Sequence, residues 1–163
     1  MRGRFLHNKI LIAAVEERFL ALGATVSREH SVKVRDRICY VDLFVSYGDS
    51  RIACEAELTT DRILNDIAKA IALDADMLLI LVPTSTMARK VQERLTMTMP
   101  GPSLIAISVL PLGVALERLR NRTSFLTLLN VPHRKRNQST MKTGTGVFQS
   151  SPPKGSICQT ERC

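Results

Sequence analysis

Three stretches in the first third of the chain have the period of two that is typical of strands buried on one face. They are Thr25–Val34, Ile38–Ser46 and Arg51–Leu58. Asp36-Arg37 and Gly48-Asp49 lie between them and are turn-forming dipeptides. The pattern therefore predicts three consecutive antiparallel strands.

Two segments with helical spacing flank these strands. Between Asn8 and Gly23, which are good start and stop residues, the apolar positions are Leu11, Val15, Phe19 and Leu22. They predict a helix over about 9–22. After the capping groups of Thr59-Thr60-Asp61, the apolar positions are Ile63, Leu64, Ile67 and Ile71. They predict the buried stripe of a second helix.

The remaining pattern alternates between strands and helices. Continuous apolar runs at Met77–Val82 and Ser103–Leu110 are typical of strands buried on both faces. Thr84–Met97 and Leu112–Leu129 have helical patterns. The prediction is an α/β fold of order α-β-β-β-α-β followed by α-β-α, in which a mixed sheet is flanked by helices and the later strands are parallel.

Composition divides the chain at about residue 132. Beyond it periodicity disappears and Ser, Thr, Gly, Pro and Lys dominate, so we expect a domain over 1–132 and a disordered tail over 133–163. The net charge is +8, and the tail holds six of the 23 basic residues but one of the 15 acidic ones. This basicity favours nucleic acid as a partner. The run Arg134-Lys135-Arg136 could contact a nucleic-acid backbone, although a tail that serves only solubility is the alternative.

Targeting and membrane signals are not expected. The longest apolar stretch of the later chain, Leu104–Leu116, is interrupted by Pro111 and is too short to span a bilayer. The four cysteines form no C-x-x-C pair, so zinc is not expected either. We expect a cytoplasmic protein without a membrane partner.

A two-residue turn at Gly48-Asp49 would make the numbers of every cross-strand pair sum to 97. Asp42 then lies opposite Glu55, and Tyr40 opposite Glu57. Since side chains alternate along a strand, these three carboxylates share one face. The opposite face is wholly apolar and holds the pairs Val41–Ala56, Leu43–Cys54 and Val45–Ile52.

Carboxylates that face one another across a sheet repel and require a raised pKa or a cation. Mg²⁺ or Mn²⁺ is the cation expected, because hard divalent ions take oxygen ligands. A solvated outer face is the alternative interpretation.

An Asp on the second strand, a Glu-x-Glu on the third and this order of elements resemble the PD-(D/E)XK nuclease superfamily, over roughly residues 8–82. The resemblance implies metal binding by Asp42, Glu55 and the carbonyl of Ala56, joined by Glu16 or Glu17 of the first helix. Glu57 occupies the usual lysine position and would be a further ligand or general base.

Other members of the superfamily place the basic residue on the following helix. In this chain the polar face of that helix carries Arg62, Asn65 and Lys69. We expect Arg62 to be the basic residue of the site because it is nearest the strand end. Lys69 would then join the basic residues along a phosphate path, which are Lys33, Arg35 and Arg37.

The resulting hypothesis is a Mg²⁺-dependent nuclease that hydrolyses DNA, for which cleavage of both strands would require a homodimer. One alternative is a nuclease-like domain without catalysis that binds nucleic acid. Another is a structural or regulatory module whose acidic face binds a partner protein.

Overall fold

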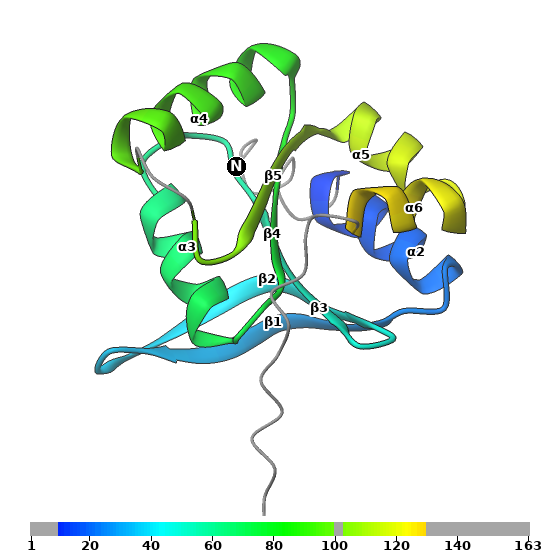
Figure 1. The fold of residues 1–163 in the computed structure, drawn as a ribbon, viewed down its shortest axis with the longest axis horizontal. Coiled ribbons are helices and arrows are strands. Elements are labelled where there is room, and N and C mark those ends of the chain that lie inside the picture. Colours follow the sequence, from blue (N-terminus) through cyan, green and yellow to red (C-terminus); the bar gives the residue numbers. More distant parts are fainter. Residues whose placement is uncertain (1–9, 100–102, 130–163) are drawn as a thin grey trace, which may run out of the picture.

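The computed structural model describes residues 10–99 and 103–129 and shows an α/β arrangement in which helices flank a mixed sheet (Figure 1). In chain order, the elements are α2 (Ala13–Ala21), β1 (Thr25–Val34), β2 (Arg37–Tyr47), β3 (Ser50–Ala56), α3 (Ile63–Ala72), β4 (Met77–Val82), α4 (Ser85–Thr98), β5 (Ala106–Pro111), α5 (Leu112–Arg118) and α6 (Arg122–Leu129). The α/β class and the mixed sheet confirm the prediction. The predicted tail, 133–163, lies outside the described residues, as do Arg134, Lys135 and Arg136.

The five strands are ordered β1-β2-β3-β4-β5 across the sheet. The β1–β2 and β2–β3 pairs are antiparallel, while β3–β4 and β4–β5 are parallel. β4 is buried along its whole length, as its apolar run predicts. β5 is only partly buried because it forms the edge of the sheet, so the expectation of burial on both faces is wrong for this strand.

Two apolar cores lie on opposite sides of the parallel part of the sheet. Figure 1 shows α2, α5 and α6 on one side of β4, and α3 and α4 on the other. Phe19, Leu79 and Phe125 belong to the first core, whereas Ile67 and Ile80 belong to the second. Alternate residues of β4 thus contribute to different cores, as expected for a central strand.

The long β1–β2 hairpin runs across the ends of both helical layers (Figure 1). As a result, Leu43 and Val45 pack in the α2-side core, whereas Val41 packs in the α3-side core. The predicted pairing of Val41 with Ala56 on one continuous apolar face is therefore wrong, because Ala56 belongs to the α2-side core. Alternation along one strand does not reveal where a twisted hairpin crosses from one core to the next.

Two further boundaries differ from the sequence prediction. The β1–β2 turn is Arg35-Asp36, because Val34 pairs with Arg37. The predicted helix over Leu112–Leu129 is two helices, since the side chain of Asn121 accepts the N–H of Ser124 at 2.9 Å and starts α6. Within the described ranges, none of the helices has the length and apolarity needed to cross a membrane.

α3 is rotated relative to its predicted orientation. Ile63, Ile67 and Ala70 are buried, while Leu64 and Ile71, assigned to the buried stripe from sequence, are exposed. Two charged residues, Asp66 and Lys69, occupy the buried face instead. This rotation brings charged groups against the sheet and positions the candidate site.

Candidate functional site

The candidate site lies where β2 and β3 separate. Their ladder pairs Leu43–Tyr47 with Ser50–Cys54, and every pair sums to 97. The register predicted from the Gly48-Asp49 turn is therefore confirmed over these five pairs, and Gly48 adopts the positive φ of +56° that such a turn requires. The ladder ends at Leu43 and Cys54, the pair next to Asp42 and Glu55.

The side chains of Asp42 and Glu55 each reach a backbone nitrogen of the opposite strand at this separation. The carboxylate of Asp42 accepts the backbone N–H of Ala56 at 2.8 Å. The carboxylate of Glu55 lies 3.5 Å from the backbone nitrogen of Asp42. Asp42 also stands opposite an irregularity in β1, where Glu29 has a φ of +44° and is omitted from the ladder. Asp42 and Glu55 thus lie close together, as the register predicts.

Lys69 of α3 reaches the gap between the separating strands. Its Nζ lies 2.5 Å from Oε1 of Glu55 and 2.8 Å from Oδ1 of Asp66. It also donates to the carbonyl oxygen of Tyr40 at 3.2 Å. Lys69 therefore belongs to the carboxylate cluster and not to a surface phosphate path, and the geometric argument that favoured Arg62 is wrong.

The reason lies in the direction of α3, which returns over the strand that precedes it. Lys69, in its second turn, comes above Glu55, whereas Arg62 stays exposed before the helix begins. Arg62 acts on the cluster only through its charge, which opposes the rise in the pKa of Glu57. Distance along the helix from the strand end therefore does not identify the residue that contacts Glu55.

Four charged side chains are buried among the described residues, and they form one cluster: Glu55, Glu57, Asp66 and Lys69. Asp66 lies close enough to Glu57 for its charge to raise the pKa of Glu57. The predicted partner of Glu57 across the strands, Tyr40, is 60% exposed, so the predicted Tyr40–Glu57 pair does not form on a shared face. Because Glu55 and Glu57 are buried, they also cannot form an acidic surface that binds a partner protein.

Asp66 is the member of the cluster that the sequence interpretation missed. It follows Ile63 by three residues and precedes Ala70 by four, which is the spacing of the buried stripe. A carboxylate at a core position of an amphipathic helix is a recognisable signal, because burial of a charge requires a partner. This signal was missed because Leu64 and Ile71 were assigned to the buried stripe from the sequence.

Burial shifts the ionisation of both glutamates. Burial and the neighbouring Asp66 raise the pKa of Glu55 to about 8, and Lys69 only partly opposes the rise. Burial, with the charge of Asp66, raises the pKa of Glu57 to about 8 as well. For Lys69, burial lowers the pKa, but Glu55 and Asp66 together outweigh it and the pKa is raised. One ammonium does not balance three carboxylates, so the cluster favours a bound proton or an added cation.

The free energy of unfolding of the metal-free protein is expected to fall as the pH rises from about 4.5 to about 8. In this window the folded state retains carboxyl protons that the unfolded chain releases, so stability is greatest below the unfolded pKa and decreases through the folded pKa. For Glu55 alone, the difference between 4.5 and about 8 corresponds to about 5 kcal/mol.

Urea denaturation at pH 5 and pH 8.5 measures this dependence. Glu55→Gln should reduce it, whereas Glu93→Gln should leave it unchanged, because Glu93 is an exposed residue of α4. Equal pH dependence in the wild type and Glu55→Gln would contradict the raised pKa.

An open pocket of about 310 Å³ adjoins Asp42 and is lined by Ile12, Arg28, Glu29 and Asp42. Arg28 also forms an ion pair with Glu16, with its Nε 2.6 Å from the carboxylate. Glu16 is partly buried, whereas Glu17 is exposed. Of the two helix glutamates, Glu16 is therefore the one directed toward the site.

The predicted metal donors do not all converge. Within residues 10–99 and 103–129, no group of three or more His, Cys, Asp or Glu side chains is arranged to hold a metal ion. Asp42 and Glu55 remain as two neighbouring oxygen donors. This set fits Mg²⁺, which commonly takes one or two carboxylates and completes its shell with water and phosphate oxygens.

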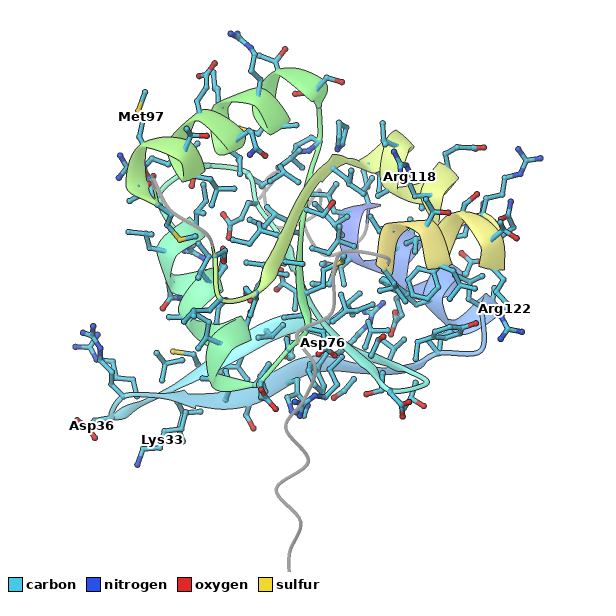
Figure 2. The ribbon with its side chains drawn as sticks, viewed as in Figure 1. Lys33, Asp36, Asp76, Met97, Arg118 and Arg122 are labelled. Atoms are coloured by element: carbon cyan, nitrogen blue, oxygen red, sulfur yellow. The ribbon has the colours of Figure 1, made fainter. Side chains whose placement is uncertain are left out.

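The basic residues predicted to contact nucleic acid have different positions. Lys33, Arg35 and Arg37 lie at the exposed end of the β1–β2 hairpin, and Figure 2 shows Lys33 and Asp36 projecting there, away from the helices. Ile38 and Tyr40 are exposed on the same hairpin. This end of the molecule thus combines positive charge with apolar side chains.

Comparisons with known proteins add no assignment. No protein-family model, curated protein or solved structure matches the chain. The functional conclusion therefore rests on the residues and their geometry.

Proposed function

We propose that this protein is a divalent-metal-dependent nuclease that hydrolyses phosphodiester bonds in DNA, on a core similar to that of the PD-(D/E)XK superfamily. The observation that carries the proposal is the 2.5 Å contact between Lys69 and Glu55. Glu57 replaces the lysine of the usual motif, and Lys69 supplies an ammonium group at the neighbouring carboxylate from the following helix. The antiparallel β1–β2–β3 arrangement with β4 parallel to β3 supports the same resemblance.

Each group has a role in this proposal. Asp42, Glu55 and the carbonyl of Ala56 would hold Mg²⁺ or Mn²⁺, which would supply an activated water and stabilise negative charge on the phosphate. Lys69 holds Glu55 in place and presents a positive charge beside the reacting phosphate. Glu16 becomes available as a further ligand when Arg28 moves to a DNA phosphate. The hairpin end with Lys33, Arg35 and Arg37 would contact the DNA backbone, and a homodimer would allow cleavage of both strands.

The proposal predicts metal-dependent cleavage. Purified protein should nick or linearise supercoiled plasmid DNA with Mg²⁺ or Mn²⁺, and EDTA should stop the reaction because the carboxylates alone cannot activate water. Agarose gel analysis measures this directly, and isothermal titration with Mn²⁺ measures metal binding separately. DNA binding without cleavage under any metal condition would contradict a nuclease.

A nucleic-acid-binding module without catalysis is the second candidate, and one observation favours it. Asp42 accepts the N–H of Ala56 and Lys69 donates to the carbonyl of Tyr40, so both residues satisfy backbone groups at the strand separation. They therefore have a structural use that does not depend on cleavage.

A further inference from the structure

Asp66 is the most deeply buried member of the charged cluster, with 1% of its surface exposed. It lies on α3, three residues before Lys69, and its Oδ1 is 2.8 Å from Nζ. The other two acceptors around Nζ are Glu55 and the carbonyl of Tyr40. Nζ donates a hydrogen bond to the carbonyl of Tyr40, and its contacts with the two carboxylates are ion pairs.

The three acceptors differ in how firmly they can hold the ammonium group. Glu55 is a proposed metal donor, and a cation bound there would repel Lys69. The carbonyl of Tyr40 is neutral and is the most distant of the three. Asp66 lies on the same helix as Lys69 and is not one of the proposed metal donors, and neither of its carboxylate oxygens has a hydrogen-bond partner within the described residues that would compete with this ion pair.

We propose that Asp66 is a positioning residue that holds the ammonium group of Lys69 beside Glu55. Its catalytic meaning rests on the proposed nuclease function, whereas the positioning itself does not. A lysine side chain has about 2 kcal/mol of rotamer entropy, so a fixed ammonium needs an anchor of this kind.

Acetylation of Lys69 by sulfo-N-hydroxysuccinimide acetate, followed by peptide mass spectrometry of the metal-free protein, tests the positioning without any activity. Asp66→Asn preserves the size of the side chain and removes its charge, so Lys69 should become several-fold more reactive. Lys90, an exposed residue of α4, is the internal control and should not change. Unchanged labelling of Lys69 in a folded Asp66→Asn protein would overturn the proposal.

A second variant guards against loss of folding. Asp66→Ala removes the carboxylate altogether and places the best helix former at this position, and it should raise the labelling of Lys69 at least as much as Asp66→Asn. If Asp66→Asn does not fold, wild-type labelling of Lys69 in a folded Asp66→Ala protein would count against the proposal.

Kinetics then test the catalytic consequence. Asp66→Asn should lower the kcat of cleavage about 10- to 100-fold, the usual effect of a residue that orients a catalytic group, without changing KM for DNA. Asp66→Glu should recover part of this loss, because it restores the charge. A wild type that does not cleave DNA would refute the nuclease proposal alone, since the labelling result would still stand; a reduced affinity for DNA with unchanged kcat would refute positioning.

Discussion

Replacing Asp42 with Asn, or Glu55 with Gln, is expected to lower the rate of DNA cleavage about a thousand-fold or more. Several kcal/mol of transition-state stabilisation come from a bound metal, and each tenfold change in rate corresponds to 1.36 kcal/mol. Asn is the sharper replacement at position 42 because its side-chain oxygen can still accept the N–H of Ala56, so the strand separation is preserved.

Single-turnover cleavage of a labelled duplex measures the rate, and Mn²⁺ titration should show weaker metal binding in both variants. Glu93→Gln is the matched control, because it removes a carboxylate from an exposed ion pair within α4. Full activity in either site variant would mean that another site, or a contaminating nuclease, produces the cleavage.

Replacing Lys69 with Met is expected to reduce kcat about 100- to 1,000-fold, the usual effect of removing one preorganised electrostatic group. Arg62→Ala should have only a small effect, because Arg62 is exposed and Lys69 contacts Glu55 directly. Met retains most of the apolar volume of the lysine stem, so loss of packing is limited.

Lys69→Met should also lower the free energy of unfolding. Removing one partner of a buried ion pair costs about 3–5 kcal/mol when the remaining charge stays uncompensated. Glu55 and Glu57, with pKa values near 8, can take up protons instead, so Lys69→Met should be most destabilising above about pH 8. Lys90→Met provides a surface control for denaturation and kinetics. A larger loss of kcat in Arg62→Ala than in Lys69→Met would indicate that Arg62, and not Lys69, supplies the positive charge used in catalysis.

Local sequence signals were sufficient for the hairpin but not for the helix that covers it. The Gly48-Asp49 turn and the apolar alternation around it correctly predict the β2–β3 register, because a two-residue turn fixes every pair after it. The rotation of α3 depends on a buried ionic cluster, whereas hydrophobic spacing alone selects Leu64 and Ile71. The spacing of apolar residues alone cannot predict a buried helix face that includes the charged residues Asp66 and Lys69.

The expectation in favour of Arg62 missed the contact between Lys69 and Glu55 for a related reason. It treated the helix as extending away from the site, although a helix that connects parallel neighbours returns over the sheet. Likewise, the position of Val41 depends on the twist of the β1–β2 hairpin across both cores, which alternation within β2 does not encode.

The separation of β2 and β3 also has a consequence for the evolution of this chain. Selection for folding alone would preserve Asp42 and Lys69, because each satisfies a backbone group there. Glu16 does not have this structural role, because its partner is the exposed side chain of Arg28. In descendants of this sequence, retention of Glu16 would therefore indicate selection for catalysis, and its loss would mark the lineages in which only the fold is maintained.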